Sequence, residues 1–338
     1  MRPTWEAHLD RDPNEETPLF ALRFDMRNAR ADHYAAALEM AVWAERNGAA
    51  GLAVCEHHGA DDGYLPSPMT LAAAMAARTS TVAISVAALI VPLHDPVELA
   101  ETRAVIDLIS NGRVAYICGV GYRPSEYVML GQDYHRRGRR MDESIKVMRQ
   151  AWTGEPFTYE GRSCRVTPLP HTPGGPTLLL GGGTPAAVRR AVRLGIGMLT
   201  ERSDDLADLY ARECAAAGVE PQFFIETPND AVTSAFLSDD PDRTWAEIGD
   251  YLLHEARSYR QWNEEAGREL PASVTRADSV AELRSEGGPY RVFTPDEALA
   301  HIRATGYLSM HPLCGGIPPE LAWPSLELLR TDVLPHLT

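Results

Sequence analysis

Positive charge is scarce in this 338-residue sequence, and lysine is almost absent. Lys146 is the single lysine, and 32 lysine and arginine residues stand against 47 acidic ones, which gives a formal net charge of -15. A surface that binds the phosphates of nucleic acid needs a basic excess. We therefore expect no nucleic-acid partner.

Long apolar runs and regularly spaced cysteines are also lacking. No run of about 18 apolar residues occurs, so we expect no transmembrane helix and no membrane partner. The polar, acidic beginning does not resemble a secretion signal. The five cysteines are odd in number and irregularly spaced, which favours reduced thiols over a disulfide framework. Together these absences predict a cytoplasmic protein.

Strand-like and helix-like stretches alternate regularly along the chain. Eight segments have the apolar pattern of strands: 18–26, 49–57, 81–93, 113–122, 176–182, 196–200, 231–239 and 306–312. Strand–helix units without intervening hairpins predict a parallel sheet, and eight strands favour a (β/α)8 TIM barrel over an open, doubly wound sheet. We expect an α/β fold with one barrel domain over residues 1–338. Long strand–helix insertions are predicted at Glu155–Pro176 and Glu264–Thr294.

The second predicted strand ends in Glu56-His57-His58, at the mouth of the barrel where active sites lie. Strand alternation places His57 on the same inward face as Ala53 and Cys55, and turns Glu56 to the opposite face. An imidazole titrates near neutral pH, so His57 is a candidate for proton transfer. The alternatives are a histidine hydrogen-bonded to backbone and a zinc site with His58. Because the spacing matches neither His-Glu-x-x-His nor Cys-x-x-Cys, we expect no metal.

The sequence GGGTPAAVRR, residues 181–190, is a candidate phosphate site. An apolar strand leads into glycines, then Thr184, a proline and a helical stretch. Free backbone N–H groups and the helix dipole favour an anion at such a turn, and Gly182 and Gly183 permit close approach of the backbone. The segment matches neither a Walker A motif nor Gly-x-Gly-x-x-Gly. An ordinary strand-to-helix turn, with Thr184 as helix cap, is the alternative.

In these features the sequence resembles the bacterial luciferase-like family of flavin-dependent oxidoreductases. The acid-His-His end of the second strand is one point of similarity. Further similar segments occur in the same order as in the family: residues 85–131, 137–162, 178–199 and 311–337. The resemblance covers roughly Pro18 to Leu337, and it is weakest in the Glu220–Thr305 region, where we expect part of the substrate pocket.

The resemblance implies a (β/α)8 barrel that binds reduced FMN, or alternatively coenzyme F420, at its C-terminal mouth. It places His57 beside the reactive edge of the flavin as the catalytic residue. The implied cofactor-binding residues are Glu56, Ala87, Ala88, Gly121, Tyr122, Gly182, Gly183 and Thr184. Ala87-Ala88 occupies the position of a non-proline cis peptide in the family, although two small residues also suit an ordinary barrel strand.

The function that the resemblance implies is monooxygenation of a small apolar or aromatic substrate with O2. Because the sequence carries no dinucleotide-binding fingerprint, reduced FMN would come from a transient flavin reductase partner. The family also suggests a homodimer. Three alternatives stay open: F420-dependent hydride transfer, a non-catalytic flavin-binding protein, and a metal-dependent hydrolase if His57 and His58 bind zinc.

Several other side chains have two possible roles. Arg123 either binds an anion or pairs with Glu126. Arginines 136, 137, 139 and 140 either line a groove for the acidic tail of F420 or pair with Asp142 and Glu143. Five further residues are candidates for lining the pocket, each with a structural role as the alternative: Tyr64, Trp152, Tyr159, His171 and His311.

Overall fold

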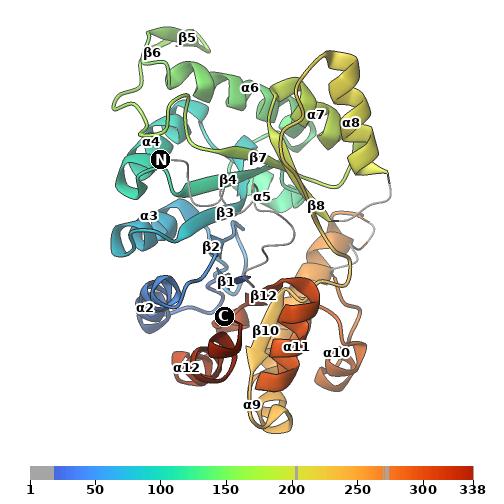
Figure 1. The fold of residues 1–338 in the computed structure, drawn as a ribbon. Coiled ribbons are helices and arrows are strands. Elements are labelled where there is room, and N and C mark those ends of the chain that lie inside the picture. The colour runs from blue at the N-terminus through green and yellow to red at the C-terminus, as the bar shows by residue number, and fades with distance from the viewer. Residues whose placement is uncertain (1–18, 202–204, 269, 271–273, 338) are drawn as a thin grey trace. The chain divides into compact units, whose positions relative to one another are not determined.

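The computed structural model describes residues 19–201, 205–268, 270 and 274–337. Its contacts divide the chain into two compact units. Unit 1 comprises Met1–Pro66, Arg78–Ile84 and Asp230–Thr338, and unit 2 comprises Ser67–Ala77 and Ser85–Asn229. Figure 1 traces the elements in chain order. The expectation of one domain over residues 1–338 stays a prediction.

Unit 1 is a group of parallel strands with helices between them in sequence. Its strands are, in spatial order, β11 (Tyr290–Phe293), β10 (Ser234–Leu237), β12 (Tyr307–Met310), β1 (Leu19–Phe24) and β2 (Gly51–Val54). Leu22 of β1 lies opposite Leu52 on one side and Met310 on the other, which sets the register of the three strands. The helices of the unit are α2 (Ala31–Arg46), α9 (Pro241–Glu265), α10 (Val280–Glu286), α11 (Pro295–Thr305) and α12 (Pro319–Leu328).

Unit 2 repeats the same architecture. β3 (Ala83–Ile90) begins in unit 1 and continues here, followed in spatial order by β4 (Val114–Gly119), β7 (Leu178–Gly181), β8 (Gly197–Glu201) and β9 (Phe224–Thr227). The pairs from β4 to β9 are parallel. Its helices are α3 (Pro68–Arg78), α4 (Pro96–Ser110), α5 (Pro124–Met129), α6 (Arg137–Ala151), α7 (Pro185–Leu194) and α8 (Leu206–Ala217). The predicted α/β class with parallel strands is confirmed.

Alternating burial along β1 positions the charged residues discussed below. Phe20, Leu22 and Phe24 are buried at every second position. The intervening Arg23 therefore points to the other face of the strand, and Asp25 follows on that face just after the strand ends. One strand thus delivers apolar side chains to one side and charged groups to the other.

The two predicted insertions contain regular structure of their own. Glu155–Pro176 includes an antiparallel hairpin, β5 (Phe157–Tyr159) with β6 (Arg162–Cys164). Glu264–Thr294 includes α10 and β11. β11 pairs with β10 along four residues that are flanked by glycine and proline, and β9 is equally short. A charged residue interrupts the apolar run in each strand, Glu226 in β9 and Arg291 in β11, which is why the sequence pattern did not predict them.

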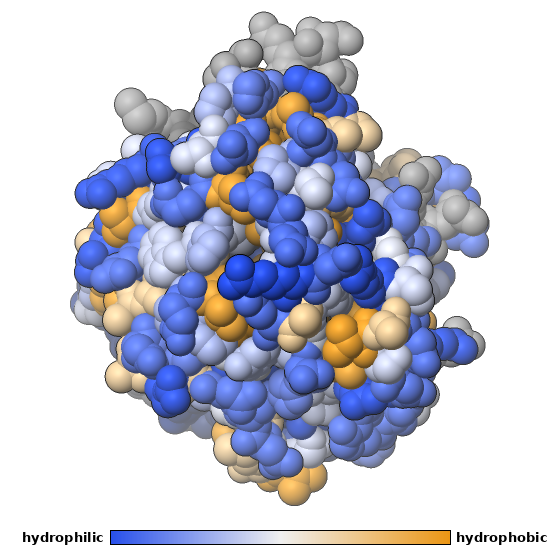
Figure 2. Space-filling model, turned by 90° about the horizontal axis from the view of Figure 1, so that it is seen from below, coloured by the Kyte–Doolittle hydropathy of each residue, from blue (hydrophilic) through white to orange (hydrophobic). Residues whose placement is uncertain are grey.

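None of the helices in the described part of the chain is long and apolar enough to cross a membrane. The face drawn in Figure 2 is dominated by hydrophilic residues, with small apolar groups among them. Exposed large apolar side chains in the described residues include Leu108 and Ile109 of α4.

Candidate functional site

The turn from β7 into α7 presents unused backbone amides at the start of a helix. Thr184 is the N-cap of α7, and its Oγ1 accepts the Ala187 N–H at 3.2 Å. The Gly182 amide donates to the Leu199 carbonyl at 3.3 Å. Within the described part of the chain, no hydrogen bond takes the amide of Gly183 or Thr184. The Thr184 hydroxyl therefore acts as a cap, while two N–H groups at the positive helix end suit an anion.

The neighbouring strand ends in unit 2 carry very small side chains. The Ala87-Ala88 peptide in β3 is cis. A Cβ added to Gly119, at the end of β4, would lie 3.1 Å from the Ala88 Cβ. Gly121 has φ +67°, and a Cβ there would meet Ile90 Cγ2 at 2.7 Å, so the position requires glycine. Because no side chain at Ala88 or Gly119 is longer than a methyl group, the surface formed by these two strands suits contact with a flat ring.

Arg123 has a carboxylate partner in its own helical turn. Its Nη1 donates to Glu126 Oε1 at 3.1 Å, and both side chains are buried. The structure thus favours the ion-pair reading of Arg123 over the anion-binding one. Tyr122, the preceding residue, receives a hydrogen bond from the Tyr134 hydroxyl on its carbonyl at 3.2 Å.

The arginine-rich start of α6 forms only some of the ion pairs that the sequence predicted. Arg139 pairs with Glu143 at 2.8 Å, one helical turn away. Asp142 instead receives Arg190 at 2.7 Å and Arg193 at 2.6 Å, both from α7. Sequence spacing predicts pairs within a helix but not pairs between helices, so the partners of Asp142 were missed.

His57 lies in unit 1 among three aromatic side chains, which we call the aromatic box: Tyr64, Tyr259 and Trp262. Its ring centroid is 4.9 Å from that of Tyr64, 5.9 Å from Tyr259 and 4.6 Å from Trp262. The side chain is buried, and its backbone N–H donates to the Leu65 carbonyl. Tyr259 and Trp262 come from α9, some 200 positions later in the chain, so local sequence could not predict them as neighbours.

Glu56 and His58 form a pair of their own. His58 Nε2 lies 2.9 Å from Glu56 Oε1, and both residues are buried. Positions two apart along an extended chain share a face, so this pairing agrees with the predicted turn of Glu56 away from His57. A contact between Glu56 and a cofactor stays a prediction. Glu56 and His57 lie in unit 1, whereas the other predicted cofactor residues lie in unit 2.

A charged cluster at the end of β1 was not predicted from the sequence. Arg23 Nη2 lies 3.1 Å from Glu255 Oε1 of α9, and Arg27 Nε lies 3.4 Å from Asp25 Oδ2. Burial alone raises the pKa of Asp25, but neighbouring His311 and Arg27 outweigh it and hold that pKa well below its ordinary value. The sequence feature that could have predicted this cluster is the charge at alternate positions, Arg23 and Asp25, of a predicted strand. Such charges are unusual in a barrel core.

Arg27 links this cluster to the aromatic box. Its guanidinium carbon lies 4.7 Å from the ring centroids of both Tyr64 and Trp262. The Tyr64 and Tyr259 hydroxyls are 2.9 Å apart, and burial raises the pKa of both. The phenols therefore stay protonated and available as hydrogen-bond donors at neutral pH.

The five residues considered for lining a pocket fall in different surroundings. Tyr64 belongs to the aromatic box, and His311 is wholly buried beside the charged cluster. Trp152 donates its indole N–H to a main-chain carbonyl of α4 at 3.0 Å, which is a structural contact. Tyr159 lies in the β5–β6 hairpin, and His171 is exposed.

Comparison with known families identifies the family to which the chain belongs. Residues 18–303 match the family model described as luciferase-like monooxygenase. The chain therefore belongs to the luciferase-like monooxygenase family, as the resemblance of its sequence predicted.

Individual relatives are more distant and match only in part. The chain is 31% identical over 170 residues to 4-hydroxyprotoasukamycin monooxygenase of Streptomyces nodosus subsp. asukaensis, which is 48% of this chain and 46% of the relative. It is 30% identical over 204 residues to protein Mb0978c of Mycobacterium bovis, which is 56% of this chain and 69% of the relative. For the first three relatives the match spans 37%, 46% and 69% of their own lengths.

Solved structures share the fold. Monooxygenase RslO1 from Streptomyces bottropensis superposes with a TM-score of 0.71 at 24% identity, covering 95% of this chain and 100% of that one. The oxygenating constituent of 3,6-diketocamphane monooxygenase from Pseudomonas putida, in complex with FMN, gives 0.66 at 19%, covering 94% and 98%. An F420-dependent secondary alcohol dehydrogenase gives 0.62 at 16%, covering 90% and 98%. This likeness confirms the predicted (β/α)8 barrel class.

Proposed function

We propose that this protein is a flavin-dependent monooxygenase that uses reduced FMN and O2 to oxidise a small organic substrate. Membership of a monooxygenase family supports the reaction class. The observation that carries the proposal of a phosphate-bearing flavin cofactor is the pair of unused amides, Gly183 and Thr184, at the N-terminal end of α7. A phosphomonoester is the kind of anion that such a turn binds.

In this proposal each part of the candidate site has a task. Gly183 and Thr184 hold the FMN phosphate, and Gly121 and Tyr122 contribute backbone beside it. The cis Ala87-Ala88 segment supports the flavin ring. Bound reduced flavin supplies the electrons that activate O2. The chemistry is that of the cofactor, whereas binding and orientation belong to the protein.

The proton transfer is assigned to His57. Its imidazole is held among the rings of Tyr64 and Trp262, which restrict its orientation and keep water away from it. Histidine is the side chain most often used in general acid–base catalysis, so this residue is proposed to deliver and take up a proton during turnover. Glu56, whose carboxylate pairs with His58, is proposed to contact the cofactor in a supporting role.

The proposal includes partners that the protein requires for turnover. A small-molecule substrate and O2 react at the site, and a separate flavin reductase delivers reduced FMN transiently. The substrate is proposed to be apolar or aromatic, since pockets at barrel mouths are lined mostly by apolar groups. We also propose a homodimer, as the family suggests.

The second candidate function is F420-dependent hydride transfer. Its support is the fold shared with an F420-dependent secondary alcohol dehydrogenase. F420 carries a phosphate that the same turn at Gly183 would accept, followed by an acidic tail. Arg139 is already paired with Glu143, so this part of the proposed groove offers less free positive charge than the sequence suggested.

A titration distinguishes the two candidates. Purified protein is titrated with oxidised FMN, reduced FMN under anaerobic conditions, and F420, and binding is followed by calorimetry and fluorescence. Saturable binding of reduced FMN at micromolar concentration, tighter than F420, supports the monooxygenase. Tighter binding of F420 selects the hydride-transfer enzyme, and failure to bind any of the three contradicts both.

A further inference from the structure

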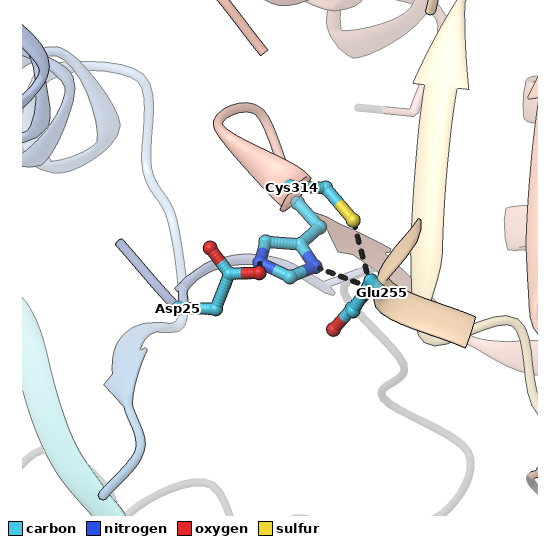
Figure 3. A group of neighbouring side chains, drawn as sticks. Asp25, Glu255 and Cys314 are labelled. Atoms are coloured by element: carbon cyan, nitrogen blue, oxygen red, sulfur yellow. Dashed lines mark hydrogen bonds and ion pairs between the residues drawn. The ribbon is translucent and has the colours of Figure 1, made fainter. Parts of the chain in front are cut away.

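Unit 1 brings together four buried side chains of the types that bind metals. They come from distant parts of the chain: Asp25 follows β1, Glu255 lies on α9, and His311 and Cys314 follow β12. Figure 3 shows the Cys314 sulfur directed at Glu255, with the Asp25 carboxylate on the opposite side of the group. We propose that these four residues bind one divalent zinc-type ion.

The distances suit a four-coordinate ion after a small rearrangement of the ligand atoms. One ligand atom from each residue lies within 4.8 Å of all the others. Cys314 Sγ is 2.7 Å from Glu255 Oε2, and His311 Nε2, the ring nitrogen that would bind the ion, is 3.7 Å from Asp25 Oδ2. Tetrahedral zinc with bonds of about 2.0–2.3 Å separates neighbouring ligand atoms by about 3.3–3.7 Å. The 2.7 Å contact between Cys314 and Glu255 would therefore have to lengthen on binding, and separations near 4.8 Å would have to shorten.

One atom of the cluster lacks the hydrogen bond that its burial demands. His311 Nε2 is buried and makes no hydrogen bond in the described part of the chain; it lies 3.7 Å from Asp25 Oδ2. The other ring nitrogen, Nδ1, lies 3.2 Å from the Ser234 hydroxyl. Leaving a buried polar atom without a partner costs about 1–3 kcal/mol. A bound ion would supply the missing partner.

Groups outside the cluster orient the ligands as outer-shell residues do in metal sites. Arg23 holds Glu255 Oε1, which leaves Oε2 directed toward Cys314. The Gly315 N–H donates to Asp25 Oδ2 at 3.1 Å. These contacts set the rotamers of both carboxylates before any ion arrives.

The ligand types decide which ion fits. A thiolate and an imidazole exclude Mg2+ and Ca2+, which require oxygen ligands, and favour Zn2+. On binding, Cys314 releases its thiol proton to solvent as the metal–sulfur bond forms. Because Arg23 and Arg27 offset the two carboxylate charges, the cluster stays balanced without the ion. Four protein ligands and full burial describe a structural site that ties β1, α9 and the turn after β12 together.

This inference does not depend on the proposed flavin chemistry, because it is tested on protein without flavin. The expectation of no metal site was based on the spacing around His57 and His58. It did not take in the four residues proposed here, which come from separate parts of the sequence. Only the His-x-x-Cys spacing of His311 and Cys314 was visible in the sequence.

The test measures metal content and cobalt spectra. Protein produced with added Zn2+ and then desalted is analysed by inductively coupled plasma mass spectrometry. We expect about one zinc per chain in the wild type and in Cys118→Ser, which removes an equally buried cysteine of unit 2. Cys314→Ser and His311→Ala are expected to lose at least 10-fold in zinc affinity.

A second measurement keeps the test decisive if a variant fails to fold. Wild-type protein freed of metal is titrated with Co2+, and a thiolate-to-cobalt charge-transfer band is expected to appear and saturate at one equivalent. Absence of both zinc and this band in folded wild-type protein overturns the proposal. So does zinc that persists in Cys314→Ser but is lost in His58→Gln, because the ion would then lie at the histidine strand.

Discussion

Among single residues, His57 has the strongest expected effect on turnover. In His57→Ala the imidazole that moves the proton is gone, so we expect turnover to fall about 10²–10⁴-fold. Affinity for reduced FMN should change little, since the proposed phosphate contacts lie on other residues. Substrate oxidation in the steady state and flavin titration of the same sample measure the two effects.

His301→Ala is the control for this substitution. His301 lies on α11 and stacks on Phe293 with 5.2 Å between ring centroids, so it has packing contacts but no part in the proposed site. Its loss should leave turnover within about twofold of the wild type. If His57→Ala turns over as fast as His301→Ala, the role proposed for His57 is wrong.

Glu45 shows how one carboxylate stabilises a loop. It lies on α2 and accepts the backbone N–H groups of Ser80 at 2.8 Å, Thr81 at 2.6 Å and Val82 at 3.0 Å. Partial burial raises its pKa, but these hydrogen bonds outweigh that effect and lower it. We expect Glu45→Gln to lower the free energy of unfolding by about 1–2 kcal/mol at pH 7, measured by urea denaturation.

The same residue predicts a dependence on pH. A carboxyl whose pKa is lowered by folding stabilises the protein above its unfolded pKa, and this contribution is lost as the pH falls through the folded pKa. The difference between wild type and Glu45→Gln should therefore shrink on acidification below pH 4.5, the ordinary pKa of the group. Glu39→Gln, at an exposed position of the same helix, should show no such trend. A constant difference across this range would contradict the argument.

Among the helices, α7 combines a structural cap with the proposed phosphate contact. Thr184→Ala removes the acceptor for the Ala187 amide and should cost about 1 kcal/mol of stability. While the hydroxyl oxygen accepts that amide, its proton can still be donated to a bound phosphate, and the substitution removes this donor as well. We expect affinity for reduced FMN to fall about 10-fold, the value of one hydrogen bond to a charged group, as measured by calorimetry.

A second N-cap provides the matched comparison. Thr294 caps α11 through the Glu297 amide at 3.3 Å, and Thr294→Ala should lose similar stability. It should bind reduced FMN like the wild type, since α11 has no part in the proposed phosphate site. Equal losses of FMN affinity in the two variants would show that general destabilisation, and not a phosphate contact, is responsible.

At the scale of the whole molecule, the proposal requires an external source of reduced flavin. The sequence carries no dinucleotide-binding fingerprint. With FMN and NADH alone, we expect oxygen consumption at the background rate of the flavin. Adding a flavin reductase, or photoreduced FMN, should start substrate oxidation. Rapid NADH oxidation by the purified chain alone would contradict this expectation.

Much of the architecture could be predicted from local sequence. The eight strand-like segments overlap strands of the structure, because β-branched and apolar alternation is a property of neighbouring residues. The turn at Gly183 and Thr184 was also visible, since capping and glycine conformations act over a few positions. The sequence by itself thus determined the α/β class, the order of eight of the strands and the family.

Only the tertiary structure decided which distant side chains meet. Arg23 and Asp25 appeared as stray charges on a strand until α9 brought Glu255 against them. Tyr259 likewise became a neighbour of His57 only through the packing of that helix. Such contacts join positions more than 200 residues apart, and they depend on how helices cover the strands. No spacing rule along the chain carries that information, because packing is set by complementary surfaces and not by sequence distance.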